Sequence, residues 1–125
     1  MKRLILASSI LGALIVTIGV FAAQADTETK NTQRASVQFN EPVKLMNVIL
    51  MGEYLFVHDE EKMAKGEDCS WVYDSKGNLV VSFHCEPVER TKASSFRIVT
   101  RRIKTDMSEL KEYQFAGETE AHQVP

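Results

Sequence analysis

The chain opens with two positive charges followed by a long apolar run. Lys2 and Arg3 precede an uncharged stretch at residues 4–23, and the sequence Ala-Gln-Ala at 23–25 places small residues where a signal peptidase reads them. This order is typical of a secretory signal peptide. We therefore predict cleavage after residue 25 and export of the remainder to the periplasm or the extracellular space. A retained anchor is the alternative, because an uncharged stretch of this length can span a bilayer.

Residues 26–125 divide by their apolar content into a leader, a domain and a tail. Residues 26–35 contain no large apolar side chain that could pack against a core, and we interpret them as a flexible leader. Residues 36–115 carry the strand patterns described next and form the predicted β domain. Residues 116–125 are mostly polar and are interpreted as an extended C-terminal tail.

Short apolar–polar alternations and runs of aromatic and β-branched residues dominate the predicted domain. The run at 53–58 is apolar on nearly both faces and is predicted to be a central strand. Gly77 and Asn78 lie between two apolar runs, which indicates a hairpin. The predicted strands are residues 36–40, 53–58, 69–73, 79–85, 95–103 and 110–115. This pattern predicts an all-β fold, a small barrel or sandwich of about six to seven antiparallel strands.

Residues 59–68 interrupt the strand pattern with a cluster of charged side chains, in which Met63 and Ala64 are the apolar members. A short helical turn or a charged loop fits this composition. The segment is long enough to be a surface excursion that carries function. A solvated loop is the simpler interpretation, because runs of charge usually face water.

The length and the charge exclude several classes of protein. The 125 residues suffice for one domain and leave no room for a two-domain enzyme. With 15 basic and 17 acidic residues the formal charge is −2, and it becomes −4 when Lys2 and Arg3 leave with the signal peptide. The sequence therefore predicts no nucleic-acid partner. A hydrophobic content of 44% argues against wholesale disorder.

Cys69 and Cys85 are the only cysteines of the sequence, and both belong to the predicted exported domain. An even number of cysteines in a small exported domain favours a disulfide. A hairpin that pairs Tyr73 with Val81 would set the two cysteines directly opposite each other, whereas a slip of one residue would put them on opposite faces. Such a bridge would contribute roughly 3 kcal/mol in the chain-entropy model. Two buried free thiols are the alternative.

Three histidines raise the question of a metal site, although we predict no bound metal or cofactor. The weak candidate ligands are His58, His84 and His122. His84 and Cys85 are adjacent on a predicted strand, so their side chains point to opposite faces and cannot easily share one ion. The cysteine spacing differs from that of a zinc knuckle. A mononuclear copper site with His58, His84, one cysteine and a nearby methionine stays open as an alternative.

No catalytic motif emerges from the sequence. The H-E-x-x-H and G-x-S-x-G patterns and a phosphate-binding glycine loop are all missing. A catalytic cysteine needs a free thiolate, whereas Cys85 follows Val81 and Phe83 on an apolar face and is predicted to be buried. We therefore predict that the protein is not an enzyme. An unusual active site in residues 59–68 is the remaining enzymatic alternative.

Basic side chains are concentrated in one part of the sequence. Residues 90–104 contain six of them and no acidic residue, and acidic residues gather at 59–68 and 109–120. Pairing of strands 95–103 and 110–115 can match these charges across the sheet. The alternative is a surface for an anionic partner, such as a cell-envelope polymer or lipid headgroups. The residues of that surface are Arg90, Lys92, Arg97, Arg101, Arg102 and Lys104.

Three stretches of the domain resemble a group of small exported bacterial proteins of uncharacterised function. They are FNEPVKLMNVILMGEYLFVHDEEKMAKGEDC from Phe39, VVSFHCEPVER from Val80 and EYQFAGETEAHQVP from Glu112. The resemblance implies a secreted bacterial β domain, and it implies no activity, ligand or catalytic residue.

The sequence thus predicts an exported, non-enzymatic, disulfide-stapled β domain that acts as a binding or interaction module in the cell envelope. Its partner would be an unknown protein or envelope component, and it would have no stable membrane span once the signal peptide is removed. A metal- or small-ligand-binding β-barrel that uses His58, His84 and His122 is the alternative.

Overall fold

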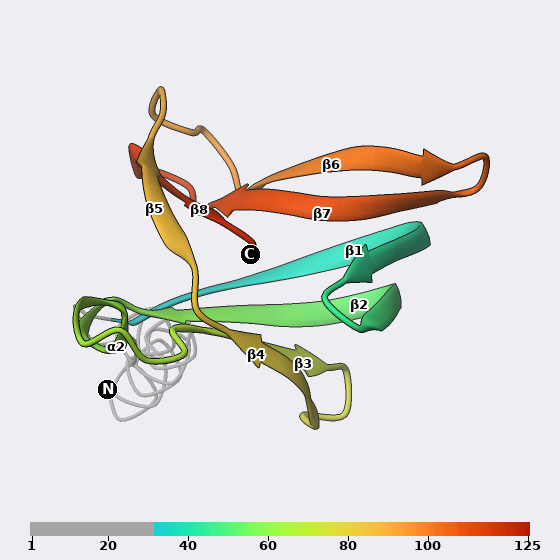
Figure 1. The fold of residues 1–125 in the computed structure, drawn as a ribbon, viewed down its shortest axis with the longest axis horizontal. Helices are drawn as coiled ribbons and strands as arrows, with labels where there is room; N and C mark the ends of the chain where they lie inside the picture. Colours follow the sequence, from blue (N-terminus) through green and yellow to red (C-terminus); the bar gives the residue numbers. More distant parts are fainter. Residues whose placement is uncertain (1–31) are drawn as a thin grey trace, which may run out of the picture. The chain divides into compact units, whose positions relative to one another are not determined.

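Strands form most of the part of the chain that the computed structural model describes, residues 32–125 (Figure 1). The predicted signal peptide and residues 26–31 of the predicted leader lie outside the described residues. The strands are β1 (Thr32–Leu45), β2 (Val48–Asp59), β3 (Ser70–Asp74), β4 (Leu79–Phe83), β5 (Glu86–Glu89), β6 (Arg97–Lys104), β7 (Met107–Gln114) and β8 (Glu120–Gln123). One short helix, α2 (Glu60–Ala64), follows β2 in the same part of the chain. The predicted all-β class is confirmed.

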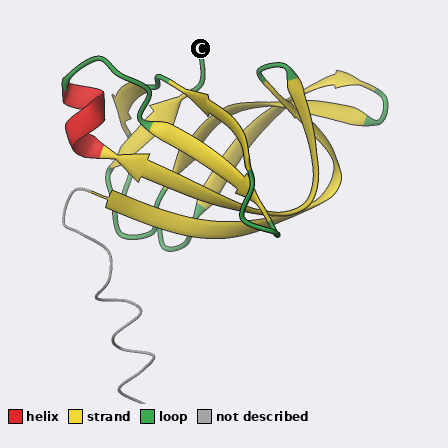
Figure 2. Ribbon diagram, turned by 90° about the horizontal axis from the view of Figure 1, so that it is seen from below, coloured by secondary structure: helices red, strands yellow, loops and turns green. Residues whose placement is uncertain are grey.

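Seven of the strands follow one another across a single sheet in the order β4-β3-β2-β1-β7-β8-β5, and β6 pairs with β7 beside this path. The sheet curls into half of a barrel, and α2 lies at one end of the long strands (Figure 2). Among the described strands, the pairing of β1 with β7 is parallel and the other pairings are antiparallel. The predicted antiparallel architecture therefore holds, with one parallel contact and one strand more than expected.

β1 joins the two halves of the sheet because it pairs with β2 along one edge and with β7 along the other. Its pairing with β2 continues on both sides of a bulge between Phe39 and Val43, where the register shifts. Pro42 lies in this bulge, where its missing N–H does not break a continuous ladder of hydrogen bonds. Beyond the bulge, Val43 and Lys44 pair in parallel with β7. A bulge bends a strand and increases its twist, so it helps the sheet to curl at this point.

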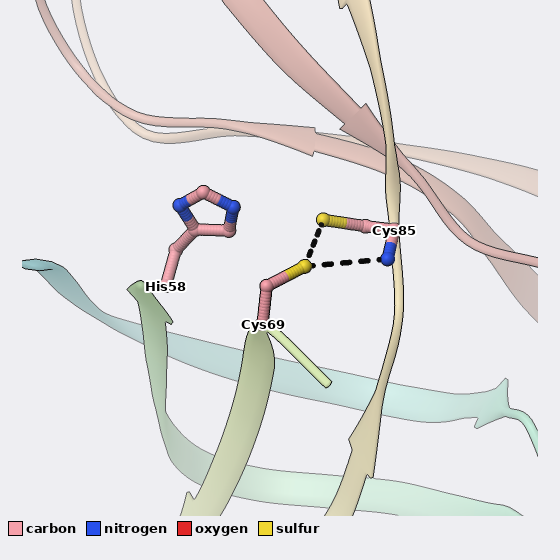
Figure 3. A group of neighbouring side chains, drawn as sticks. All are labelled: His58, Cys69 and Cys85. Carbon is pink, nitrogen blue, oxygen red and sulfur yellow. Dashed lines mark hydrogen bonds between the residues drawn. The ribbon is translucent and has the colours of Figure 1, made fainter. Parts of the chain in front are cut away.

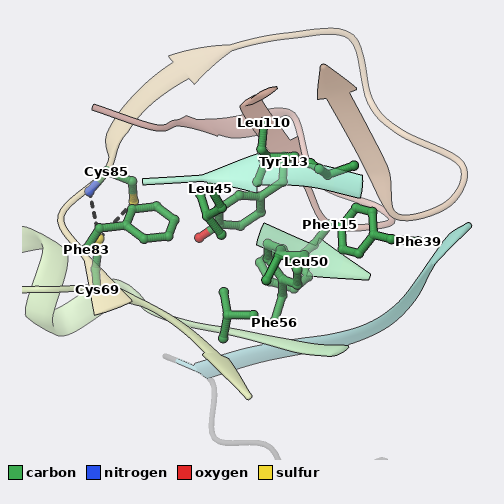
Figure 4. Packing of buried hydrophobic residues seen from close by; sticks show 12 residues of the cluster. Phe39, Leu45, Leu50, Phe56, Cys69, Phe83, Cys85, Leu110, Tyr113 and Phe115 are labelled. Carbon is green, nitrogen blue, oxygen red and sulfur yellow. Dashed lines mark hydrogen bonds between the residues drawn. The ribbon is translucent and has the colours of Figure 1, made fainter. Parts of the chain in front are cut away.

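Large apolar side chains on the inner face of the sheet pack into one core (Figure 4). Phe56 of β2 meets Tyr113 of β7 edge-on, with 5.5 Å between the ring centroids. Tyr113 in turn meets Phe115 at right angles, with 5.7 Å between the centroids. The Tyr113 hydroxyl shares a hydrogen bond with the hydroxyl of Ser70. The two halves of the sheet are therefore tied together through one buried tyrosine.

α2 is the short helical turn that the charged segment at residues 59–68 predicts. Asp59 caps its first turn, because the backbone N–H of Lys62 donates to Asp59 Oδ1 at 3.1 Å. Glu60 and Glu61 lie in the first turn, where acidic side chains interact favourably with the helix dipole. None of the five residues of α2 is buried. Within residues 32–125, no helix is long and apolar enough to cross a membrane.

The sheet extends further at both ends of the chain than the sequence pattern predicts. β1 begins at Thr32, so the last four residues assigned to the leader belong to the sheet. Residues 120–123 form β8, in which Ala121 and His122 are buried, and their interpretation as a tail is wrong. β8 pairs with β5, a strand that was not predicted. Both strands have four residues, so their sequences are too short to show a periodic pattern.

The predicted hairpin of β3 and β4 is confirmed, but its register is shifted by one residue. Val81 pairs with Val72 and not with Tyr73. In two regular strands this shift would separate the cysteines onto opposite faces. Cys69, however, precedes β3, and Cys85 follows β4, so both lie where the regular alternation has ended. This irregular backbone allows both side chains to be buried despite the shift.

Candidate metal centre

Three buried side chains from different parts of the chain converge at one end of the core. His58 is the next-to-last residue of β2, Cys69 lies immediately before β3, and Cys85 lies between β4 and β5. A ring nitrogen of His58 and the two Sγ atoms all lie within 4.8 Å of one another. Figure 3 shows the imidazole and the two thiols pointing toward one another. Each of the three residues is at most 1% exposed.

Backbone geometry holds these side chains in place. Alternation along β2 puts His58 on the same face as Phe56, which is the core face. The N–H of Asp59 donates to the carbonyl of Cys69 at 2.9 Å. The N–H of Cys69 donates to the carbonyl of Phe83 at 3.1 Å. These two hydrogen bonds carry the ladder past the formal ends of the strands, so Cys69 is fixed between its neighbours.

The two sulfur atoms are in contact but are not bonded. Cys69 Sγ and Cys85 Sγ lie 2.8 Å apart, whereas a disulfide bond is about 2.05 Å long. Both cysteines are buried. The N–H of Cys85 also donates to Cys69 Sγ at 3.3 Å. The expectation that these cysteines lie together is therefore confirmed, and the covalent bridge remains a prediction.

The imidazole of His58 is buried without any hydrogen-bond partner among the described residues. Neither Nδ1 nor Nε2 has one, and the residue is 0% exposed. Burial lowers the pKa of His58 to about 4, so the ring is neutral at pH 7. A neutral imidazole keeps a lone pair on one nitrogen, which can bind a metal ion.

A second buried imidazole lies against the first. The rings of His58 and His122 are in contact, with 3.9 Å between their centroids and a tilt of 32° between their planes. Nδ1 of His122 lies 3.7 Å from Cys85 Sγ. Burial and, to a smaller extent, the neighbouring His58 lower the pKa of His122 to about 3, so this ring is also neutral at pH 7. His122 therefore offers a fourth donor atom beside the group of three.

Cys85 is held in its protonated form by its surroundings. Burial raises the pKa of this thiol to about 12, and the hydrogen bond with Cys69 contributes to the increase. Thiolates, and not thiols, bind metal ions and attack electrophiles. Cys85 is therefore a poor nucleophile at neutral pH, and a metal ion must displace its proton to bind.

The charged segment at residues 59–68 contributes two further groups to this end of the core. The thioether Sδ of Met63 in α2 lies 3.9 Å from Cys85 Sγ. Oε1 of Glu60 is buried and has no hydrogen-bond partner in the described part of the chain. Burial and the adjacent carboxyl of Glu120 raise the pKa of Glu60 to about 7. Glu120 Oε1 lies 4.0 Å from Nε2 of His122, so a carboxyl flanks the imidazole on the side away from Cys85.

His84, the third candidate histidine, does not belong to this cluster. Its Nδ1 lies 3.1 Å from the carbonyl oxygen of Glu67, its Nε2 lies 3.8 Å from Glu86, and its side chain is 38% exposed. The neighbouring Cys85 is fully buried, so the two adjacent side chains point in different directions. The candidate metal set with His84 as a ligand is therefore wrong, while its other two histidines do come together.

The predicted basic surface is partly neutralised by acidic side chains. The guanidinium of Arg90 donates two hydrogen bonds of 2.8 and 2.9 Å to the carboxylate of Glu112. Arg97 donates a further hydrogen bond to the same carboxylate. Arg101 pairs with Glu109 at 3.1 Å across β6 and β7. Arg102 pairs with Glu41, while Lys92 and Lys104 are exposed. Charge matching across the sheet therefore accounts for most of the segregation in the sequence.

A cleft of about 640 Å³ lies on the outer face of β1, β2 and β3. Its lining includes Arg34, Trp71 and Tyr73, and both aromatic rings are half-buried. Lys62 of α2 covers part of this surface, with Nζ 5.4 Å from the centre of the Trp71 ring. Cys69 is also among the lining residues, so the cleft reaches the residue that precedes β3.

The donor set fits a metal ion that prefers sulfur and nitrogen. Thiolate and imidazole bind Zn²⁺ and Cu⁺ well. A tetrahedral ion about 2.3 Å from sulfur and 2.1 Å from nitrogen holds its ligand atoms roughly 3.5–3.8 Å apart. The 3.7 Å between Cys85 Sγ and His122 Nδ1 matches this spacing. The two sulfurs are closer than this, so they would move apart by about 1 Å around an ion.

The sequence identified most of these residues individually and did not group them correctly. It paired the cysteines with each other in a disulfide, and its metal-binding alternative combined His58 and His122 with His84. It placed His122 in a tail, so no strand pairing predicted that this ring lies against His58. Pairing of β8 with β5 and β7 brings His122 inward. The neighbouring Ala121, which lies in a mostly polar segment, was the one feature of the sequence that could have indicated the burial of His122.

No family model matches the sequence, and no curated protein or solved structure is detectably similar to it. The chemistry of the cluster therefore has to be argued from its own geometry.

Proposed function

We propose that this domain binds a thiophilic transition-metal ion, with Cys69, Cys85 and His58 as ligands and His122 as a fourth donor. The buried imidazole of His58, which has no hydrogen-bond partner within residues 32–125, is the observation that carries the proposal. Leaving a buried polar group without a hydrogen-bond partner costs about 1–3 kcal/mol. An ion bound to His58 offsets that cost, and it also uses the two thiols that face the ring.

Protonation of the site supports metal binding at neutral pH and above. Both imidazoles are neutral at pH 7, so their lone pairs need no deprotonation. Cys85 must lose its proton when the ion binds, since only the thiolate is a ligand. Binding therefore releases protons, and the apparent affinity increases with pH.

Equilibrium dialysis of the reduced, chelator-treated protein against Zn²⁺ or Cu⁺, followed by elemental analysis, tests the proposal. We expect one ion per chain. His58→Ala removes one ligand and should weaken binding by about tenfold or more. His84→Ala is the matched control, because His84 is an exposed histidine next to a proposed ligand and does not contact the cluster. Its affinity should equal that of the wild type.

Two results would contradict metal binding at this site. One is that neither ion is retained by the reduced wild-type protein. The other is that His84→Ala loses the ion as completely as His58→Ala does, which would place the binding site elsewhere on the surface.

A disulfide-stapled interaction module of the cell envelope is the second candidate function, and the contact between the two sulfurs favours it. A bridge between Cys69 and Cys85 and an ion bound to both thiolates exclude each other. Thiol titration of the unfolded, unreduced protein from its exporting host separates the two functions. No free thiol would support the staple, and two free thiols would support the metal centre. The cell-envelope module relies on export, which the apolar start of the sequence predicts.

A further inference from the structure

The cluster contains three sulfur atoms from three different segments, and the third comes from a methionine. Met63 Sδ lies 3.9 Å from Cys85 Sγ, on which His122 Nδ1 also converges at 3.7 Å. Met63 is partly buried and packs against the core cluster to which both cysteines belong. A nitrogen donor and a thioether therefore both lie within 4 Å of Cys85 Sγ.

The imidazole nitrogen of His122 and the thioether of Met63 favour different metal ions. Zn²⁺ is bound in proteins by thiolate, imidazole and carboxylate, and it would use the two cysteines with His58 and His122. A thioether is uncharged, soft and polarizable, and it is a characteristic ligand of Cu⁺. A site that recruits Met63 is therefore matched to the softer ion.

We propose that Met63 is a ligand of this centre and that the ion it takes is cuprous copper, Cu⁺. This inference rests on the proposed metal-binding function and specifies its ion. The bound ion would be held by Cys69, Cys85 and Met63, with His58 as the nitrogen donor. No change of oxidation state is part of the proposal.

The position of Met63 on α2 supports a role in binding rather than in core packing alone. α2 is a five-residue helix without a buried residue, yet it directs this one side chain toward Cys85. Polar contacts of its neighbours fix the helix to the sheet. Lys62 lies over the Trp71 ring, and the Lys62 N–H donates to Asp59. The thioether therefore reaches the other ligands from a segment that is fixed in place and lies at the surface.

Replacing Met63 with leucine tests this inference, because leucine keeps the volume and removes the sulfur. The affinity for Cu⁺ is measured anaerobically by competition with bicinchoninate, and the affinity for Zn²⁺ by competition with a chromophoric chelator. We expect Met63→Leu to weaken Cu⁺ binding by about tenfold or more, the size of effect typical when a metal site loses a supporting group. Zn²⁺ binding should change by less than about twofold, since no zinc ligand is removed. Met51→Leu is the matched control, because Met51 is an exposed methionine on β2.

X-ray absorption at the copper edge provides a second measurement that remains informative if the variant is unstable. The wild type should show three sulfur neighbours of the ion. Two sulfur neighbours, or an unchanged Cu⁺ affinity in Met63→Leu, would overturn the role of Met63 while leaving metal binding itself intact. A wild-type protein that binds neither ion would instead reject the proposed function.

Discussion

His58 occupies a position that the pattern of β2 assigns to the core, two residues after Phe56 on the same face. An apolar side chain there would pack against its neighbours without leaving any polar atom unpaired. The imidazole instead keeps two buried nitrogens without a partner in the described part of the chain. Residues that reduce stability in this way are expected at functional sites, where stability is exchanged for activity.

Replacing His58 with leucine should therefore abolish metal binding without reducing the stability of the metal-free protein. Without metal, the free energy of unfolding of His58→Leu should equal or exceed that of the wild type, because an unpaired polar group is removed and the volume is nearly kept. Ion binding should be lost. Urea unfolding in the presence of a chelator measures the first quantity. A decrease of more than about 1 kcal/mol would show that the imidazole stabilises the metal-free fold.

Glu112 is the residue whose ionisation most clearly stabilises the fold. It is 5% exposed, and the hydrogen bonds from Arg90, supported by Arg97, lower the pKa of its carboxyl from 4.5 to about 2. Because the folded-state pKa lies below the unfolded value, the ionised form stabilises the protein above pH 4.5. This contribution of about 3 kcal/mol is lost as the pH falls through 2.

We therefore expect Glu112→Gln to be less stable than the wild type at pH 7 and the difference to shrink steadily below pH 4.5. Urea unfolding of both proteins between pH 7 and pH 2.5 measures this difference. Titration of all other groups affects both proteins and cancels in the comparison. A difference that stays constant over this range would mean that the two arginines do not act on the charge of Glu112.

At the residue scale, the sequence predicted local relationships better than distant ones. It predicted that His84 and Cys85 point to different sides, because adjacent residues on a strand alternate. It could not predict that the His122 ring packs against the His58 ring, since that contact depends on β8 pairing with β7. The relation of Met63 to Cys85 was equally hidden, because the charged residues around Met63 indicate solvent and not a core.

At the scale of elements, the predicted strands were those with enough residues to show a period. β2 has twelve residues and β7 has eight, and the sequence predicted a strand that overlaps each of them, at residues 53–58 and 110–115. β5 and β8 have four residues each and pair with each other. Their stability comes from partners distant in the chain, so no local pattern could reveal them. Because β8 was not predicted, the burial of His122, one of the two buried imidazoles, was not predicted either.

The importance of β8 can be tested with two aspartates placed on the same strand. Ala121 is fully buried and Gln123 is exposed. Ala121→Asp introduces an unpaired charge into the core and should reduce the free energy of unfolding by about 3 kcal/mol or more. Gln123→Asp should change it by less than about 0.5 kcal/mol. Urea unfolding measures both, and equal effects would mean that β8 is not docked on the sheet.

At the scale of the whole described domain, the proposed ligands connect parts of the chain that are far apart in sequence. His58 belongs to β2, Cys69 precedes β3, Cys85 precedes β5, and His122 belongs to β8. These elements include strands near both ends of the sheet order. An ion bound to all of them would act as a cross-link between the two ends of the curled sheet.

Binding should therefore stabilise the domain as a whole. An ion present at one hundred times its dissociation constant raises the free energy of unfolding by about 2.7 kcal/mol, provided that it does not bind the unfolded chain. Cysteines in the unfolded chain do bind such ions, so the measured increase will be somewhat smaller. Thermal unfolding with and without the ion measures it. His84→Ala should be stabilised as much as the wild type, and a stabilisation that persists in a Cys69→Ser, Cys85→Ser double variant would contradict the cross-link.

Nitrogen-15 NMR of the histidine rings tests the central claim most directly, because it observes the proposed ligand itself. The reduced protein is examined before and after addition of one equivalent of Zn²⁺ and, in a parallel sample, of Cu⁺. We predict that a ring nitrogen of His58 changes its chemical shift with at least one of these ions, while both nitrogens of His84 stay where they were. An unchanged His58 ring with both ions, or a change confined to His84, would contradict a metal centre at His58, Cys69 and Cys85.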